Sequence, residues 1–315
     1  MRTKVSIIEK AVNRLESSNE IKKEPKILSD STIREEDEIA FDTSTSKIIE
    51  EQRNDTFFSS KVEDLDDSNT TQYGEIDLKK LKESGMITPD GEKTQLSEEF
   101  RIIKRPLLTN AFNRGAAPIK NGNLVMVTSS FPGEGKSFSA INLAMSIAME
   151  RDHTVLLVDA DVAKPSVPGF LGLESRKGLM DLILDENLKF SDVLIKTNVE
   201  KLNVLPAGRS HIHATELLAS ESMGRLLDEI SQRYSDRIII FDSPPLLATT
   251  ESRVLASRMG QIVMVVEAAK TPQAAVKEAL SQIDKCEVVG LLLNKGSSVI
   301  GDDQFAYGTY GGYGA

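Results

Sequence analysis

Cysteine, histidine and long apolar runs are scarce or missing in this sequence. Cys286 is its one cysteine, so no disulfide can form within the chain. His211 and His213 have only His153 to join them, which is too few for a Cys/His metal cluster and favours a surface loop. Because there is no signal peptide and no run of about 18 apolar residues, we expect a cytoplasmic protein that reaches the inner face of the plasma membrane only through a partner.

Positive charge is also in short supply. The chain has 38 Lys and Arg against 48 Asp and Glu, and −7 of its net charge of −10 falls on residues 1–95. Nothing in this balance predicts nucleic-acid binding, so we expect no nucleic-acid partner. The 315 residues suffice for one α/β domain of about 200 residues with extensions at its ends.

Residues 1–95 are expected to form an acidic, mostly disordered extension. Apolar residues at helical spacing predict a small amphipathic helix over 5–17, and a second short helix is expected near 75–84. Between them, residues 18–71 are rich in Ser, Thr, Asp, Glu and Lys, which predicts disorder. The first helix could dock on a partner, pack on its own domain or fray, because a short isolated helix is marginally stable.

A glycine-rich turn at 129–137, Ser-Ser-Phe-Pro-Gly-Glu-Gly-Lys-Ser, lies between an apolar run and a helix-like stretch. Strand, glycine loop, Lys-Ser and helix in this order are typical of a phosphate cradle, with Lys136 as a mobile charge and Ser137 as a Mg²⁺ ligand. The pattern normally begins with Gly where this chain has Ser130, so alone it indicates only that phosphate binds. The expected lining of the nucleotide site is Pro132, Gly133, Glu134, Gly135, Lys136, Ser137 and Phe138.

Strand and helix patterns alternate after this loop, which predicts a doubly wound parallel sheet of the P-loop NTPase type, a Rossmann-like three-layer fold. The expected strands lie at 154–159, 202–205, 237–241, 262–266 and 288–293. The expected helices lie at 137–150, 215–233, 251–258 and 272–284. This gives a domain over 96–300, followed by a Gly/Tyr-rich tail at 301–315.

Two of these strands end in aspartate. Asp159 and Asp161 follow one apolar run, and Asp242 follows another. Carboxylates near a phosphate cradle imply a cation, and Ser137, Asp161 and Asp242 make a reasonable Mg²⁺ shell together with water and phosphate. Lys136, Asp159 and Asp161 are the candidate catalytic residues for phosphoryl transfer, and the sequence does not separate the roles of the two aspartates.

A helix is predicted upstream of the loop, with Ser97 as N-cap and Pro106 just past its end. Glu98, Arg101 and Arg105 are spaced by three and four residues, so they share one face. This face could be solvated and paired with itself. Alternatively, it could contact a neighbouring protomer in a heterologous arrangement that closes into a ring.

Together these motifs resemble the bacterial tyrosine kinases of exopolysaccharide export, over about residues 96–296. Residues 129–137 look like their Walker A motif, 158–161 like their second acidic motif and 241–245 like their Walker B motif. Further matches are 205–208, 216–218 and 290–294, and they imply a place for Asp242 and Asn294 in the nucleotide site. A closer resemblance, to the exosortase-associated tyrosine autokinases, is carried by residues 6–11, 99–108 and 161–165.

The resemblance implies a function that the spacing does not show. Members of the family phosphorylate a C-terminal tyrosine cluster of a neighbouring protomer, here Tyr307, Tyr310 and Tyr313, using ATP and Mg²⁺. The resemblance also implies a ring-like homo-oligomer, an octamer by likeness to the family, and a membrane-embedded polysaccharide chain-length determinant protein as partner. Lys104 occupies the third basic position of the ring-forming motif unless Arg105 substitutes. Ala163 replaces a usual basic residue, for which Lys164 could compensate.

Two rival functions use the same features. Partition and septum-positioning ATPases belong to the same P-loop branch, but their loop carries an extra lysine where this chain has Phe131. A scaffold that binds nucleotide without catalysis is the second rival. The retained catalytic set argues against it: Lys136, Ser137, Asp159, Asp161 and Asp242.

Overall fold

The computed structural model describes residues 4–8, 72–112, 118–174, 176–233, 236–284 and 286–296. The predicted disorder over 18–71, most of the predicted helix over 5–17, and the tail at 301–315 lie outside the described residues.

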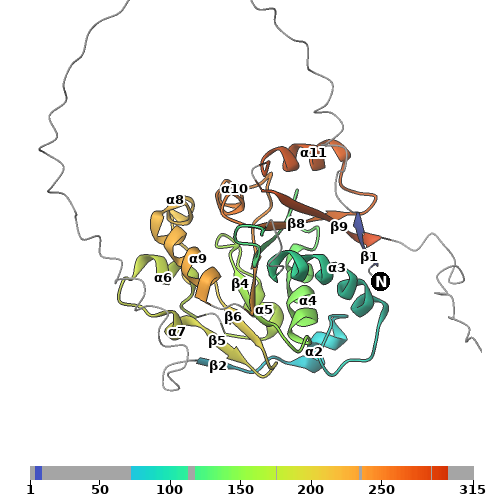
Figure 1. Cartoon of the computed structure of the whole chain (residues 1–315), viewed down its shortest axis with the longest axis horizontal. Coiled ribbons are helices and arrows are strands. Elements are labelled where there is room, and N and C mark those ends of the chain that lie inside the picture. The colour runs from blue at the N-terminus through green and yellow to red at the C-terminus, as the bar shows by residue number, and fades with distance from the viewer. Residues whose placement is uncertain are drawn as a thin grey trace, which may run out of the picture. The chain divides into compact units, whose positions relative to one another are not determined.

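Nine strands of the described residues form one sheet, in the order β1-β9-β8-β3-β7-β4-β6-β5-β2 (Figure 1). Their bounds are β1 (Lys4–Ile8), β2 (Gln72–Gly74), β3 (Leu124–Ser129), β4 (Thr154–Asp159), β5 (Ile195–Thr197), β6 (Leu202–Leu205), β7 (Arg237–Asp242), β8 (Gln261–Glu267) and β9 (Val288–Gly296). The six strands from β9 to β6 are parallel to one another, whereas β1 and β5 pair antiparallel with β9 and β6.

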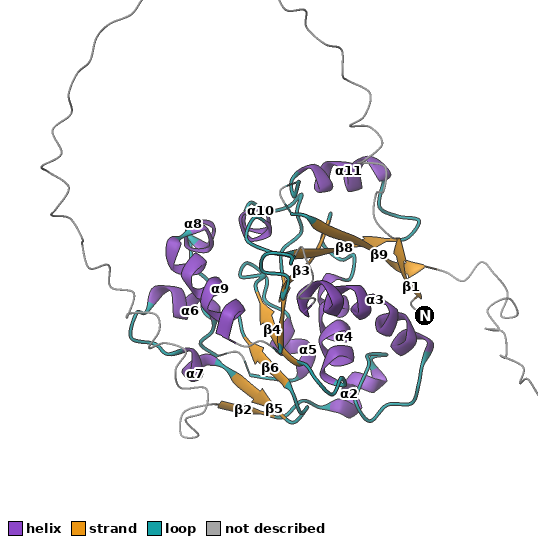
Figure 2. Ribbon diagram, viewed as in Figure 1, coloured by secondary structure: helices purple, strands orange, loops and turns teal. Residues whose placement is uncertain are grey.

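Helices cover both faces of this sheet (Figure 2). They are α2 (Leu78–Glu83), α3 (Gln95–Phe112), α4 (Lys136–Ala148), α5 (Val167–Leu171), α6 (Leu179–Leu184), α7 (Phe190–Val193), α8 (Ala214–Ala219), α9 (Glu221–Arg233), α10 (Glu251–Ala256) and α11 (Gln273–Ser281). The three-layer, doubly wound α/β fold predicted from the sequence is confirmed.

Two separate hydrophobic cores result from the alternation of side chains along the strands. In β3, Leu124 and Met126 belong to the core under α6 to α11, whereas Val125 and Val127 belong to the core under α2 to α5. Because both faces are buried, the central strands are continuous apolar runs, which is why their bounds could be predicted closely.

The prediction of a helix over 5–17 is wrong for its first turn. Residues 4–8 instead form the edge strand β1, which pairs with β9. Val5, Ile7 and Ile8 are β-branched and suit a strand. The open edge of β9 supplies backbone hydrogen-bond partners, which outweighs the preference of a short segment that is marginal as a helix. Residues 9–17 lie outside the described residues.

The helix predicted over 97–106 is longer than expected at both ends. Thr94 rather than Ser97 caps it, since the backbone N–H of Ser97 donates to Thr94 Oγ1. Pro106 lies inside α3 instead of ending it. Phe100, Ile103 and Leu107 are all buried in the core that α3 shares with α4, and this packing offsets the roughly 3 kcal/mol that an interior proline costs.

The single helix predicted over 215–233 is interrupted. Ser220 is extended between α8 and α9, and its hydroxyl accepts from the backbone N–H of Met223, as in an N-cap. The short strands β2 and β5 were not predicted, because three residues are too few for a periodic signal. Across the described ranges, no helix combines the length and the apolar character needed to cross a bilayer.

Candidate active site

The loop between β3 and α4 has the backbone shape of a phosphate cradle. Gly133 and Gly135 have φ angles of 86° and 100°, in the left-handed region that residues with a Cβ rarely adopt. A Cβ on Gly135 would also collide with the side-chain amide of Asn294. Ser130 needs no such freedom, because it is not among the residues with positive φ, and this explains why the usual first glycine is dispensable here.

The backbone N–H groups from Gly133 to Phe138 have no hydrogen-bond acceptor among the described residues. They belong to the loop and to the first turn of α4, where the positive end of the helix dipole adds to their effect. A run of free donors around one turn is the arrangement that binds phosphate oxygens.

Asp159 and Asp242 end neighbouring parallel strands and lie directly opposite each other in the register of β4 and β7. Both side chains are fully buried. Lys136 joins this cluster from the first residue of α4, with its Nζ 2.7 Å from Asp161 Oδ2 and 3.4 Å from Asp242 Oδ1. The sheet therefore brings the predicted lysine and all three predicted aspartates to one place.

Burial and the neighbouring charges shift the pKa values of this cluster. Burial alone would lower the pKa of Lys136, but the carboxylates of Asp242 and Asp161 outweigh it and raise that pKa. Burial raises the pKa of Asp242 although Lys136 counteracts it. The carboxylates of Asp161 and Asp242 thus share one ammonium, and an acidic pair of this kind beside a phosphate cradle suits a divalent cation.

Asp159 and Asp161 differ in what their oxygens contact. Asp159 Oδ2 accepts from the backbone N–H groups of Ser166 and Val167, both at 2.9 Å, and Oδ1 accepts from that of Asp161 at 3.3 Å. Burial and the Asp242 carboxylate raise the pKa of Asp159 to about 7. Asp159 therefore positions the loop after β4, whereas Asp161 reaches Lys136 directly. The sequence alone had left these roles unseparated.

Ser166 is a member of the site that the sequence did not single out. Its Oγ donates to Ser137 Oγ at 2.9 Å and to Asp242 Oδ2 at 3.5 Å. In the described ranges, no three Asp, Glu, His or Cys residues form a group that could hold a metal ion by themselves. A Mg²⁺ ion held by Ser137, Asp242, water and phosphate fits this set, since Mg²⁺ keeps few protein ligands.

A second layer of contacts supports the loop from the β8 and β9 side. Glu134 is buried, and its carboxylate accepts from the backbone N–H of Phe131 and from the Thr271 hydroxyl. Asn294 Nδ2 donates to Glu134 O at 2.9 Å, and Lys295 Nζ donates to Gly133 O at 2.6 Å. Glu134 and Asn294 thus shape the loop. Thr271 and Lys295 were missed, because no motif marks them.

The other predicted lining residues lie at the rim of the loop. Pro132 and Gly133 are exposed, and Phe138 is partly buried. Ala163 and Lys164 are both exposed, and the role of Lys164 in place of the missing basic residue stays a prediction. Tyr307, Tyr310 and Tyr313 lie outside the described residues.

The face predicted for contact between protomers needs one correction. Lys104 is buried, and its Nζ donates to Ser146 O at 2.6 Å and pairs with Glu150 at 2.7 Å, inside the same chain. Arg101 and Arg105 are exposed on α3, and Arg101 pairs with Glu98 at 2.9 Å. Lys104 therefore faces α4 of its own chain, one residue away from the exposed stripe that holds Arg101 and Arg105.

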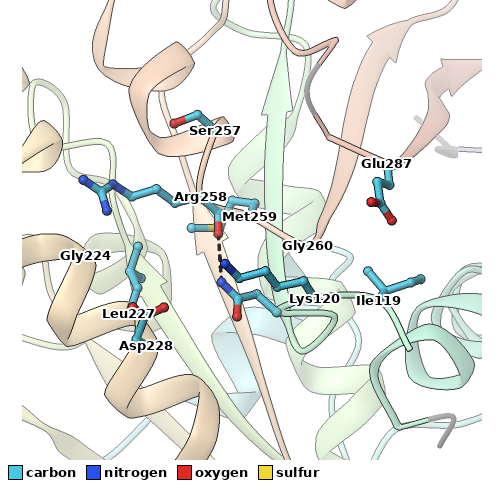
Figure 3. A pocket seen from close by; sticks show the side chains of 11 residues that line it. Ile119, Lys120, Gly224, Leu227, Asp228, Ser257, Arg258, Met259, Gly260 and Glu287 are labelled. Atoms are coloured by element: carbon cyan, nitrogen blue, oxygen red, sulfur yellow. Dashed lines mark hydrogen bonds between the residues drawn. The ribbon is translucent and has the colours of Figure 1, made fainter. Parts of the chain in front are cut away.

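A cavity of about 370 Å³ lies at the opposite edge of the sheet (Figure 3). Lys120, Asp228, Arg258 and Glu287 line it, near the amino ends of β3, β8 and β9. It contains no residue of the phosphate loop or of the aspartate cluster, so it is not the nucleotide site.

His211 and His213 lie in a partly exposed loop before α8 and hold no metal cluster within the described residues.

Known proteins resemble this chain over the same region. The family model described as an AAA domain matches residues 123–289, more than half of the chain. Tyrosine-protein kinase YwqD of Bacillus subtilis is 34% identical over 205 residues, which cover 64% of this chain and 82% of that protein. Tyrosine-protein kinase CpsD of Streptococcus agalactiae is 30% identical over 198 residues, 62% of this chain and 83% of that protein. The crystal structure of the chimerical protein CapA2B2 superposes with a TM-score of 0.55 at 28% identity, covering 70% of this chain and 93% of that one.

Proposed function

Because the chain belongs to the bacterial tyrosine-protein kinase family, we propose that it is an ATP- and Mg²⁺-dependent autokinase acting on Tyr307, Tyr310 and Tyr313 of a neighbouring copy. The observation that carries this proposal is Lys136, whose ammonium lies between Asp161 and Asp242 directly below a loop of free N–H groups. Phosphoryl transfer needs mainly positioned groups and neutralised charge, and this site offers both.

Each residue then has a specific part in the proposed reaction. The loop N–H groups and Lys136 would hold the triphosphate and neutralise charge on the transferred phosphoryl group. Ser137 and Asp242 would hold Mg²⁺, which neutralises phosphate charge when bound, and Asp161 would complete its shell through water. Asp161 is also the carboxylate best placed to orient the attacking phenol, since Asp159 is engaged by backbone N–H groups.

The partition-type ATPase is the less favoured alternative. Phe131 stands where those enzymes carry a second lysine, and it is exposed at the rim of the loop. The two relatives described above are named tyrosine-protein kinases. β9 ends at Gly296, and Lys295 Nζ donates to Gly133 O, so the last described residues before the tail lie beside the phosphate loop.

The proposed biological setting is regulation of exopolysaccharide biosynthesis and export. Residues 6–11, 99–108 and 161–165 support the exosortase-associated subfamily. We propose a cytoplasmic enzyme that a membrane-embedded chain-length determinant protein recruits to the plasma membrane. A segment before residue 72 is the proposed place for that partner.

A groove on α3 supports the proposed ring. Arg101 and Arg105 lie on one side of a cavity of about 440 Å³, and Glu150, Asp152 and His153 lie on the other. Bases and acids that flank the same groove suit a heterologous contact, in which each protomer presents one side to the next. Glu98 would exchange its bond to Arg101 for one to the neighbour.

Replacing Arg101 and Arg105 with alanine is expected to convert the oligomer into monomers, because both exposed guanidinium groups are lost from the contact. Sedimentation velocity measures the change. The matched control is the double replacement of Lys79 and Lys80, two exposed lysines of α2, which removes the same charge and should leave the oligomer intact. Oligomers that survive the arginine replacements would remove α3 from the interface.

Mass spectrometry after incubation with Mg-ATP tests the proposed activity. We expect phosphate on tail peptides that contain Tyr307, Tyr310 and Tyr313, and its loss from those positions when all three are phenylalanine. The cytoplasmic segments of the membrane partner should be included, since a slow enzyme can require an activator. Steady ATP hydrolysis without any phosphotyrosine would favour the ATPase alternative.

A further inference from the structure

Tyr73 is the one tyrosine among the residues that the structure describes, and 63% of it is exposed to solvent. Its hydroxyl forms no hydrogen bond and its ring no aromatic contact within the described ranges. A ring with this exposed fraction does not contribute to the packing of the hydrophobic core. The phenol oxygen is therefore accessible to a reacting group.

The position of Tyr73 also exposes its backbone. It is the middle residue of β2, the last strand in the order of the sheet, so one edge of β2 has no partner strand among the described residues (Figure 1). An extended edge segment with free backbone groups can be bound by another protein as an added strand.

The sequence around Tyr73 matches that of the tail tyrosines. Tyr73 is followed by Gly74, and each of the three tail tyrosines is also followed by glycine, whereas Tyr234 is followed by Ser235. Acidic residues precede both regions, at 63–67 before Tyr73 and at 302–303 before the tail. Gly74 has a packing role too, since a Cβ there would lie 2.7 Å from Leu173 and 2.8 Å from Ile195. That packing explains the glycine and leaves the exposed phenol unexplained.

We propose that Tyr73 is a second phosphate acceptor, modified in trans by the nucleotide site of another copy of this chain. The inference rests on the proposed kinase function. The phenol oxygen attacks the γ-phosphorus of ATP, the bond from that phosphorus to the β–γ bridging oxygen breaks, ADP leaves, and the phenolic proton passes to solvent.

Lys196 would face the new phosphate. It is the register partner of Tyr73 in the parallel pairing of β2 with β5, so the two side chains lie on the same face of the sheet, and Lys196 is exposed. A phosphotyrosine adds about −1.5 to −2 charges at pH 7. Phosphorylation is therefore expected to hold β2 onto β5 rather than to release it.

An isotope-mixing experiment tests the proposal with the full-length chain. Unlabelled wild type is mixed with a ¹⁵N-labelled Lys136→Ala chain and Mg-ATP, and phosphotyrosine is mapped in light and heavy peptides. We expect heavy peptides containing Tyr73 to carry phosphate, at least tenfold above a reaction that contains only the Lys136→Ala chain. A ¹⁵N-labelled chain with Lys136→Ala and Tyr73→Phe is the matched control, because phenylalanine keeps the ring and should keep the fold.

The outcomes separate this proposal from the proposed function. Phosphate on heavy tail peptides without phosphate on Tyr73 would overturn the second acceptor and leave the kinase intact. Phosphate on Tyr73 of light peptides only would show modification within one chain and would overturn transfer in trans. A total lack of phosphotyrosine would overturn both proposals.

Discussion

Replacement of Lys136 with alanine is expected to lower tyrosine phosphorylation at least about 100-fold at saturating Mg-ATP, the scale for losing one well-placed charge or donor. The ammonium group is 2.7 Å from Asp161 and 3.4 Å from Asp242, so its loss leaves these two carboxylates without their cation beside the phosphate cradle. Repulsion of ATP adds to the loss of charge neutralisation. The rate of phosphate incorporation into the tail measures the effect.

Two comparisons make this expectation specific. Lys120→Ala removes the same charge at the amino ends of the strands, where its side chain lines the cavity of about 370 Å³, and should leave the rate within about twofold. Circular dichroism of the Lys136→Ala chain should match the wild type, because only a side chain at the start of α4 is shortened. A rate that survives the loss of Lys136 would mean that phosphate is held by other groups.

Gly178→Ala is expected to lower the free energy of unfolding by about 3 kcal/mol, near the upper end of ordinary single substitutions. A Cβ at this position would collide with the backbone carbonyl of Pro206 and approach the nitrogen of Gly208. The backbone is held close here because Leu179 N–H donates to Pro206 O at 2.8 Å. The atoms that a Cβ on Gly178 would meet all belong to the backbone of Pro206 and Gly208, so the clash cannot be relieved by a side chain that changes its rotamer.

Asp181 holds the backbone near Gly178 and the backbone near Pro206 together. Separating them to make room for a Cβ at position 178 would therefore break further hydrogen bonds. Its carboxylate accepts from the backbone N–H groups of Gly178 and Arg209, and it pairs with the Arg209 side chain at 2.6 Å. Burial opposes these bonds, but Arg209 and the two N–H groups hold the pKa of Asp181 below its usual value. A depressed pKa means that this stabilisation is present above the unfolded-state pKa and is lost as the pH falls through the folded-state pKa.

Urea denaturation of Gly178→Ala and Gly169→Ala measures the difference. Gly169 lies inside α5, and a Cβ there would meet nothing within 4 Å, so alanine should be neutral or slightly stabilising in that helix. Equal free energies of unfolding for the two variants would show that the backbones at residues 178 and 206 can move apart without loss of stability.

Central elements of the fold could be predicted because their signals are local. β4 and β6 have the bounds that were expected, since each is a short, mostly apolar run between polar turns. The turn at 129–137, with Lys136 and Ser137 at its end, follows from residue order alone. The carboxyl ends of parallel strands meet at one edge, which made the meeting of Asp159, Asp161 and Asp242 foreseeable.

The edge strands of the sheet, and which side of a helix is buried, were not predictable in this way. β1 forms because β9 offers an open edge, and β2 forms because β5 does, so both depend on partners far along the chain. Lys104 is one residue away from Arg105, yet it is buried against α4, because packing fixes the rotation of α3. Pro106 stays within α3 for the same reason.

The sequence by itself determined the phosphate loop, the parallel strands and the three aspartates, because backbone preference and apolar periodicity are written in consecutive residues. Only the tertiary structure decided that Asp159 is held by Ser166 and Val167 while Asp161 reaches Lys136. It also brought Ser166, Thr271 and Lys295 to the loop. These contacts join residues distant in sequence, and their geometry is set by how helices and loops pack across the sheet.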